Sequence, residues 1–144
     1  MLLLVAVACL AGIVIGSAVT FAFLSSQRAI PSSGLVVSVG VGVYSDAGCT
    51  VNVTSVDWGS VYPGESVSRV VYVKNTGNAP ITLGMATGGW NPAVAEGQLA
   101  ISWNREGASL SPNGSIAATL TLTVSASVHD VASFSANIII TGSG

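Results

Sequence analysis

The stretch from Val56 to Pro80, VDWGSVYPGESVSRVVYVKNTGNAP, decides the fold that this sequence predicts. Residues 62–65, YPGE, are typical of a turn, because proline fixes φ and glycine accepts a positive φ. Residues 66–76 then place valines and Asn75 on one face and mainly polar side chains on the other, which predicts a half-buried strand. Residues 76–80, TGNAP, break that strand before the next apolar run. The stretch therefore predicts consecutive strands joined by tight turns.

Similar alternation of apolar and polar residues occurs along most of the remaining chain. Residues 51–58 change parity between Val53 and Val56, so a bulge is expected near residues 54–55. Helix content after residue 30 is expected to be almost nil, and a β-sandwich follows from so many short strands. Together with residues 66–76, the expected strands are seven, the others being residues 35–43, 51–58, 81–85, 99–103, 116–124 and 134–140.

The N-terminal region has a different character from the rest of the chain. Residues 2–24 form a run of 23 residues without a charge, which matches the roughly 20 apolar residues that cross a membrane. We expect a hydrophobic helix over residues 1–26, acting as a membrane anchor or a filament core, a linker over 27–34, and the sandwich over 35–144. A cleaved signal peptide is the alternative, although the run is long for one and has no basic start.

Small residues recur along the expected helix at Ala8, Gly12 and Gly16, so they share one face and allow close helix packing. If copies associate, two modes of contact are available. Helices can pack along this stripe, or residues 35–43 can complete the open sheet edge of a neighbouring copy. The helix route is favoured, because residues 35–43 have a simpler place as the first strand of their own sandwich.

Several motifs together resemble a known family. Trp58-Gly59, Pro63-Gly64, residues 75–80 (NTGNAP) and residues 81–83 (ITL) are similar to the immunoglobulin-like sandwiches of the ASPM/SPD-2/Hydin type. The resemblance covers roughly residues 51–124, and it is closer to archaeal surface proteins that join such a domain to one N-terminal hydrophobic helix. A weaker resemblance is to archaeal pilins. The resemblance implies a fold and a surface location, and it brings no catalytic residue.

Composition points in the same direction. The 144 residues are 50% hydrophobic and 7% charged, against about 25% charged residues in ordinary soluble domains. With four Lys and Arg against six Asp and Glu, the chain lacks the basic surface that nucleic-acid backbones require. Life at a membrane or cell surface is favoured, with membrane lipid as the partner of the N-terminal helix. No other ligand is indicated by the sequence.

Motifs for catalysis or metal binding are not found in the sequence. His129 is the sole histidine, and neither G-x-S-x-G nor H-E-x-x-H occurs. The six carboxylates are scattered, without the dense acidic spacing of a calcium loop, so no catalytic, cofactor or metal residue is predicted. Tryptophans at 58, 90 and 103 can form a sugar-stacking platform, but full or partial burial in the core is the favoured interpretation.

Two short motifs bear on modification. Asn52-Val-Thr54 and Asn113-Gly-Ser115 are acceptors for a glycan on an exported protein. Asn113 is the better candidate, because it lies in an expected turn, whereas Asn52 lies in an expected strand. Cys49 is predicted to be a free thiol, because Cys9 lies in the hydrophobic segment and out of disulfide reach.

These observations lead to one expected function and one main alternative. The chain is expected to be a non-catalytic, single-pass surface protein with a structural or adhesive role and its C-terminal domain outside. Arg28 alone opposes that orientation under the positive-inside rule. The alternative is a pilin-like subunit of an extracellular filament assembled through the N-terminal helix, although no charged leader precedes that helix. A soluble binding module released by signal cleavage is a further alternative.

Overall fold

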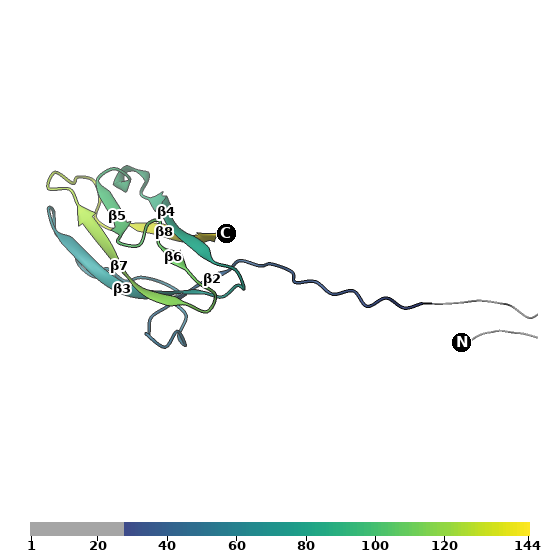
Figure 1. The fold of residues 1–144 in the computed structure, drawn as a ribbon. Coiled ribbons are helices and arrows are strands. Elements are labelled where there is room, and N and C mark those ends of the chain that lie inside the picture. Colours follow the sequence, from purple (N-terminus) through teal and green to yellow (C-terminus); the bar gives the residue numbers. More distant parts are fainter. Residues whose placement is uncertain (1–27) are drawn as a thin grey trace, which may run out of the picture. The chain divides into compact units, whose positions relative to one another are not determined.

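The computed structural model describes residues 28–144. Within them, residues 35–144 form one compact unit that is all-β, and its strands make two antiparallel sheets (Figure 1). The expectation of an all-β domain is therefore confirmed, and the paired sheets are consistent with a β-sandwich. The elements are β2 (Val41–Tyr44), β3 (Ser66–Asn75), β4 (Ile81–Asn91), the short 3-10 helix η2 (Ala93–Ala95), β5 (Leu99–Trp103), β6 (Ser109–Leu110), β7 (Ser115–Val124) and β8 (Ser135–Ser143).

One sheet has the strand order β2-β3-β7-β5, and the other has the order β6-β4-β8. The long pairing of β3 with β7 is central to the first sheet, with Val71 opposite Ala118 and Val73 opposite Ile116. This pairing joins two segments that the sequence predicted as alternating strands. Cross-strand pairs of apolar and β-branched residues stabilise such a sheet.

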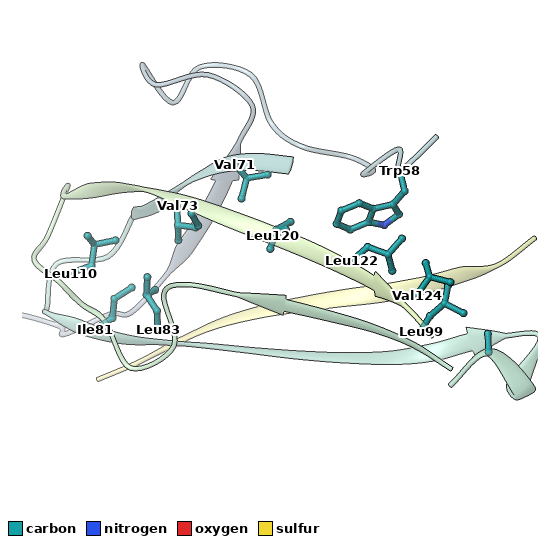
Figure 2. Close-up of a cluster of buried hydrophobic side chains, with 12 residues drawn as sticks. Trp58, Val71, Val73, Ile81, Leu83, Leu99, Leu110, Leu120, Leu122 and Val124 are labelled. Carbon is teal, nitrogen blue, oxygen red and sulfur yellow. The ribbon is translucent and has the colours of Figure 1, made fainter. Parts of the chain in front are cut away.

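The core lies where the inner faces of the two sheets meet (Figure 2). Alternation along β3 and β7 places every second side chain inward, which confirms the faces predicted for both strands. Ile81 and Leu83 supply the inner face of β4. The buried apolar side chains that Figure 2 labels are Trp58, Val71, Val73, Ile81, Leu83, Leu99, Leu110, Leu120, Leu122 and Val124.

Asn75 is a fully buried polar residue at the end of β3. Its amide nitrogen donates to the carbonyl oxygens of Ala79 (2.8 Å) and Leu110 (3.0 Å), and its amide oxygen accepts from the Gly77 N–H (2.9 Å). The side chain thus satisfies backbone groups of the turn after β3 and of β6 in the other sheet. This network explains why the strand ends at the predicted break, because the turn is tied to the core.

The prediction of a first strand over residues 35–43 is wrong for its first half, since β2 begins only at Val41. The reason is that the pairing partner β3 ends at Asn75, opposite Val41. Residues 36–40 instead lie beside the turn after β3, where a Cβ atom on Gly77 would overlap the Ser38 carbonyl oxygen. Glycine is required there by close approach of two backbones.

The prediction of a strand with a bulge over residues 51–58 is also wrong. Only Asn52 forms an isolated bridge, with Tyr44, and the rest of the segment has no strand pairing. After Val53 the chain leaves β2. Its later residues Asp57 and Trp58 are held by Arg69 of β3, whose guanidinium donates to their carbonyl oxygens. Side-chain hydrogen bonds replace a ladder in this segment.

Two further differences concern the second sheet. β4 extends to Asn91, well beyond the expected end at residue 85, and its register with β8 shifts between Gly88 and Asn91. The short β6 lies in a region expected to be a connection, where it pairs with the first residues of β4. The described strands are again seven, but β6 takes the place of the strand expected at 51–58.

The expected hydrophobic helix over residues 1–26, with Ala8, Gly12 and Gly16, lies outside the described residues. Among residues 28–144 there is no helix with the length and apolar character that crossing a membrane demands.

Candidate functional site

A groove of about 760 Å³ opens between the two sheets on the side where β8 faces β2 and residues 53–58. Its floor is the core itself, through Val71, Ile101 and Leu120. Its walls are uncharged and mainly apolar, and the remaining lining residues are Val41, Val43, Val53, Thr54, Ser55, Val56, Trp58, Phe134, Ser135, Ala136, Asn137, Ile138, Ile139 and Ile140.

One wall of the groove is β8, which lies at the end of the second sheet. β8 pairs with β4 on one edge, and within residues 28–144 no strand pairs with its other edge. Ile138 and Ile140 point to the core side but are only half-buried, and Ile139 on the other face is 49% exposed. An open edge with apolar side chains on both faces is a template for another strand.

The opposite wall is the segment of residues 53–58. Trp58 is buried there, and the Arg69 guanidinium carbon lies 6.0 Å from the centroid of its indole ring. Arg69 donates from Nε to the Asp57 carbonyl oxygen (2.9 Å) and from Nη2 to that of Trp58 (3.1 Å). The backbone of residues 54–56 makes no hydrogen bond to any other group of residues 28–144. The groove is thus bounded by unpaired backbone on both sides.

The chemistry that this groove offers is burial of apolar groups and backbone pairing. Its lining contains no acid, base or nucleophilic thiol, and the polar side chains in it are those of Thr54, Ser55, Ser135 and Asn137. An apolar pocket with few polar groups suits an apolar ligand or an extended chain segment. Sequence patterns do not reveal this groove, because residues 51–58 and 134–140 both have the alternation of ordinary strands.

The two predicted glycan acceptors are both accessible. Asn113 is exposed in the turn before β7, with a positive φ of 63°, and Asn52 is exposed beside β2. Their modification stays a prediction. Neither residue lines the groove.

His129 lies in the loop before β8 and is exposed, as expected for a loop residue. Its backbone N–H donates to the side-chain oxygen of Gln98 (2.8 Å). Within residues 28–144 no three His, Cys, Asp or Glu side chains gather in a way that would hold a metal ion.

The carboxylates that the structure does engage have structural partners. Glu106 accepts from the Trp103 indole N–H (2.8 Å) and from the Met85 N–H (3.1 Å). Asp46 accepts from the Thr50 hydroxyl (2.6 Å) and from the Thr50 and Val51 N–H groups, both at 2.9 Å. These bonds, the hydroxyl bond first, lower the pKa of Asp46 from its ordinary value of 3.8.

The three tryptophans have different surroundings. Trp58 is buried in the core, and Trp90 and Trp103 are half-buried and packed against it, as expected. Trp90 stacks on Phe134 with ring centroids 6.1 Å apart and an interplanar angle of 29°. Cys49 is half-buried in the loop after β2, and the prediction that it does not pair with Cys9 stays a prediction, because Cys9 lies outside the described residues.

Comparison with protein-family models, with curated proteins and with solved structures finds no match to this chain.

Proposed function

We propose that this chain is a non-catalytic cell-surface protein with a structural or adhesive role. An immunoglobulin-like β-sandwich, residues 35–144, is displayed on a single hydrophobic N-terminal helix, with the domain on the outside of the cell membrane. The supporting sequence features are the uncharged run of residues 2–24, the polar linker of residues 27–34 and the low content of charged residues.

The observation that carries the proposal is the uncharged lining of the groove beside β8. Proton transfer needs a titratable side chain, and a hydroxyl nucleophile needs a base beside it; the lining has the hydroxyls of Thr54, Ser55 and Ser135 but no acid or base. The free edge of β8 and the apolar walls instead suit association with an extended chain. An uncharged, mainly apolar groove beside an unpaired strand edge suits assembly or adhesion better than catalysis.

Location is tested by treating intact cells with an external protease, using full-length protein with a C-terminal epitope. We expect the epitope to be lost from intact cells while the N-terminal segment stays in carbonate-washed membranes. A chain with Ile13→Arg and Ile15→Arg should leave the membrane fraction, because each central arginine costs about 2.5–3.5 kcal/mol of insertion free energy. The matched control is Ser25→Arg with Ser26→Arg, beyond the apolar run. An epitope protected in intact cells would contradict the proposal.

The alternative, a pilin-like subunit whose N-terminal helices form a filament core, differs in what is seen on the cell. Electron microscopy of native cell envelopes labelled for this protein would show label along fibres. A solitary anchored protein would show label spread over the membrane surface.

A further inference from the structure

We infer that residues 35–39 of one copy add as an extra strand to the free edge of β8 in a second copy, and insert Leu35 and Val37 into its groove. This segment, LVVSV, is called the donor segment below. The inference deepens the proposed function by naming the partner of the groove. It rests on that function only for the cellular location, the cell surface, at which two copies would meet.

The donor segment is apolar and exposed. Leu35, Val37 and Val39 share one face of an extended chain and are 77%, 65% and 50% exposed. Such a row of exposed apolar side chains is unfavourable in water, and covering it gives a driving force for association.

The backbone of the donor segment is paired on one edge only. Four hydrogen bonds join residues 36–40 to residues 76–78: Thr76 N–H to Gly40 O, Asn78 N–H to Ser38 O, Ser38 N–H to the Asn78 side-chain oxygen, and Asn78 Nδ2 to Val36 O. The peptide groups of Leu35, Val37 and Val39 make no hydrogen bond within residues 28–144. Peptide groups of alternate residues point to opposite edges of a strand, so this second edge is available for pairing.

The groove complements the donor segment in three respects. It offers the unpaired edge of β8, it exposes apolar walls at Ile138 and Phe134, and its lining has no charge. Residues 29–43, which contain the donor segment, have no charge either. No buried charge therefore has to be desolvated when the two surfaces meet.

The donor segment cannot fill the groove of its own domain while its four hydrogen bonds to residues 76–78 persist. Those bonds keep it at the end of the sandwich where β8 finishes, since Val39 lies against the C-terminal Gly144. The groove extends from Phe134, just before β8, along β8 to residue 140. A second copy can present its donor segment there without breaking any of these bonds.

The donor and acceptor surfaces differ, so the contact is heterologous. Each copy that gives its donor segment still has a free groove, and each copy that accepts one still has a free donor segment. Such contacts build a chain or a ring of copies rather than a closed pair of identical surfaces. Assembly by this route does not need the stripe of Ala8, Gly12 and Gly16.

A disulfide test distinguishes pairing between copies from other routes. Full-length chains in detergent, with Cys9→Ser and Cys49→Ser, are prepared in two populations that bear tags of different mass. One population has Val37→Cys and the other has Ile138→Cys. After mixing and mild oxidation, a reducible dimer of mixed mass is expected. The control replaces Val37→Cys by Val94→Cys, an exposed position on η2 outside both surfaces. No mixed dimer, or an equal yield with the control, would overturn the inference.

A second test measures association by sedimentation over a range of concentrations. Leu35→Asp with Val37→Asp should weaken association by about ten-fold or more, because two charges would enter an apolar groove. Val94→Asp should leave it unchanged, and so should Gly12→Ile with Gly16→Ile. Loss of association in the helix variant alone, or wild-type chains that stay monomeric, would refute the inference. A groove that is occupied by a lipid acyl chain instead would show as wild-type monomers carrying lipid mass.

The outcome can be separated from that of the proposed function. Protease accessibility on intact cells does not depend on the donor segment, so it should be the same for the wild type and for Leu35→Asp with Val37→Asp. If the chain is protected from protease in intact cells but forms mixed dimers, the proposed surface role is contradicted and the donor-segment contact stands. If the chain is accessible to protease but forms no mixed dimer, the surface role stands and the donor-segment contact is contradicted.

Discussion

Strands β7 and β8 have the same alternating pattern but very different burial. On β7 every inward residue from Ala118 to Val124 is buried and only Ile116 at the start is half-buried, whereas the inward residues of β8, including Ile138 and Ile140, are all half-buried. β7 has a strand on each edge, and β8 has one strand, with the groove beside it. Alternation therefore reports which face of a strand is inward, and the neighbours decide how completely that face is covered.

The same contrast separates the two sides of the domain. Where β3 turns into β4, Asn75 ties the turn and β6 together, and the core is closed by Val73, Ile81 and Leu110. On the other side, residues 54–58 make no backbone–backbone hydrogen bond within residues 28–144, and the groove reaches the core. The closed side should account for most of the stability of the isolated domain, and the open side should account for its association.

The largest effect is expected from Leu122→Asp on the closed strand β7. Leu122 is fully buried, and an unpaired carboxylate there costs about 4 kcal/mol or more of unfolding free energy, enough to unfold most of a marginally stable domain. Thr123→Asp is the matched control, because Thr123 is exposed on the outer face, where strand propensity and one long hydrogen bond from the Ser66 hydroxyl (3.4 Å) together contribute about 1 kcal/mol or less. Chemical denaturation of both variants measures the difference. Similar losses would mean that the assigned inner face of β7 is wrong.

The second largest effect is expected from Asn75→Leu. The change leaves the carbonyl oxygens of Ala79 and Leu110 and the N–H of Gly77 without their partners, at a cost of about 1–3 kcal/mol for the buried Leu110 carbonyl and less for each of the two partly buried groups. A total loss of about 3 kcal/mol in the free energy of unfolding is expected after partial relaxation.

The control for Asn75→Leu is Asn78→Ala, because Asn78 is exposed and, within residues 28–144, its side chain hydrogen-bonds only to Val36 and Ser38. Its loss should leave the unfolding free energy within about 0.5 kcal/mol of the wild type, as for other surface changes. Equal losses for the two asparagines would contradict the idea that the closed side depends on Asn75.

Much of the closed side could be predicted from the sequence. The inward faces of β3 and β7 follow from period-two alternation, and the turns follow from Pro63, Gly64 and the residues after Asn75. These features are local, so a short window of sequence contains the information. The buried role of Asn75 was anticipated only as its place on the inner face.

The open side could not be predicted, because it depends on which segments lack a neighbouring strand in the folded domain. Alternation over residues 35–43 predicts a strand, but β3 ends opposite Val41, and no local pattern shows that. The parity change between Val53 and Val56 did signal an irregularity, which was interpreted as a bulge rather than as the loss of pairing. Likewise, the half-burial of Ile138 depends on the empty position beside β8, which is a property of the whole fold.

A pair of truncations compares the two strands directly. Leu120→Ala on β7 removes fully buried methyl groups and should cost about 3 kcal/mol of unfolding free energy. Ile138→Ala on β8 should cost less, about 2 kcal/mol, because that side chain is already partly exposed to solvent in the groove. Equal costs in dilute, monomeric samples would show that the groove is closed in solution. At concentrations where copies associate, the cost of Ile138→Ala should rise, since the donor segment then covers it.

The smallest effect is expected from the loop that leaves β2 on the open side. Its partly exposed Asp46 carboxylate accepts from the Thr50 hydroxyl and from the N–H groups of Thr50 and Val51. These bonds hold the pKa of Asp46 below 3.8, so its ionised form is favoured in the folded loop. A group whose folded pKa is lowered stabilises the fold at pH values above its unfolded pKa, and this contribution is lost as the pH falls through the folded pKa.

The pH dependence should therefore appear as a local event in acid. In a nuclear magnetic resonance titration, the Thr50 and Val51 amide signals should move with one midpoint below pH 3.8, while the signals of β3 and β7 stay in place. Asp46→Asn should abolish that transition. Thr50→Val should move the midpoint upward toward 3.8, because the hydroxyl bond contributes most to the lowered pKa of Asp46. A wild-type midpoint at or above 3.8 would mean that the loop is not held by Asp46 in solution. The open side would then lack this anchor next to β2. The groove wall that follows the loop would be held less firmly than the closed side for two reasons, the missing backbone pairing and the loss of this anchor.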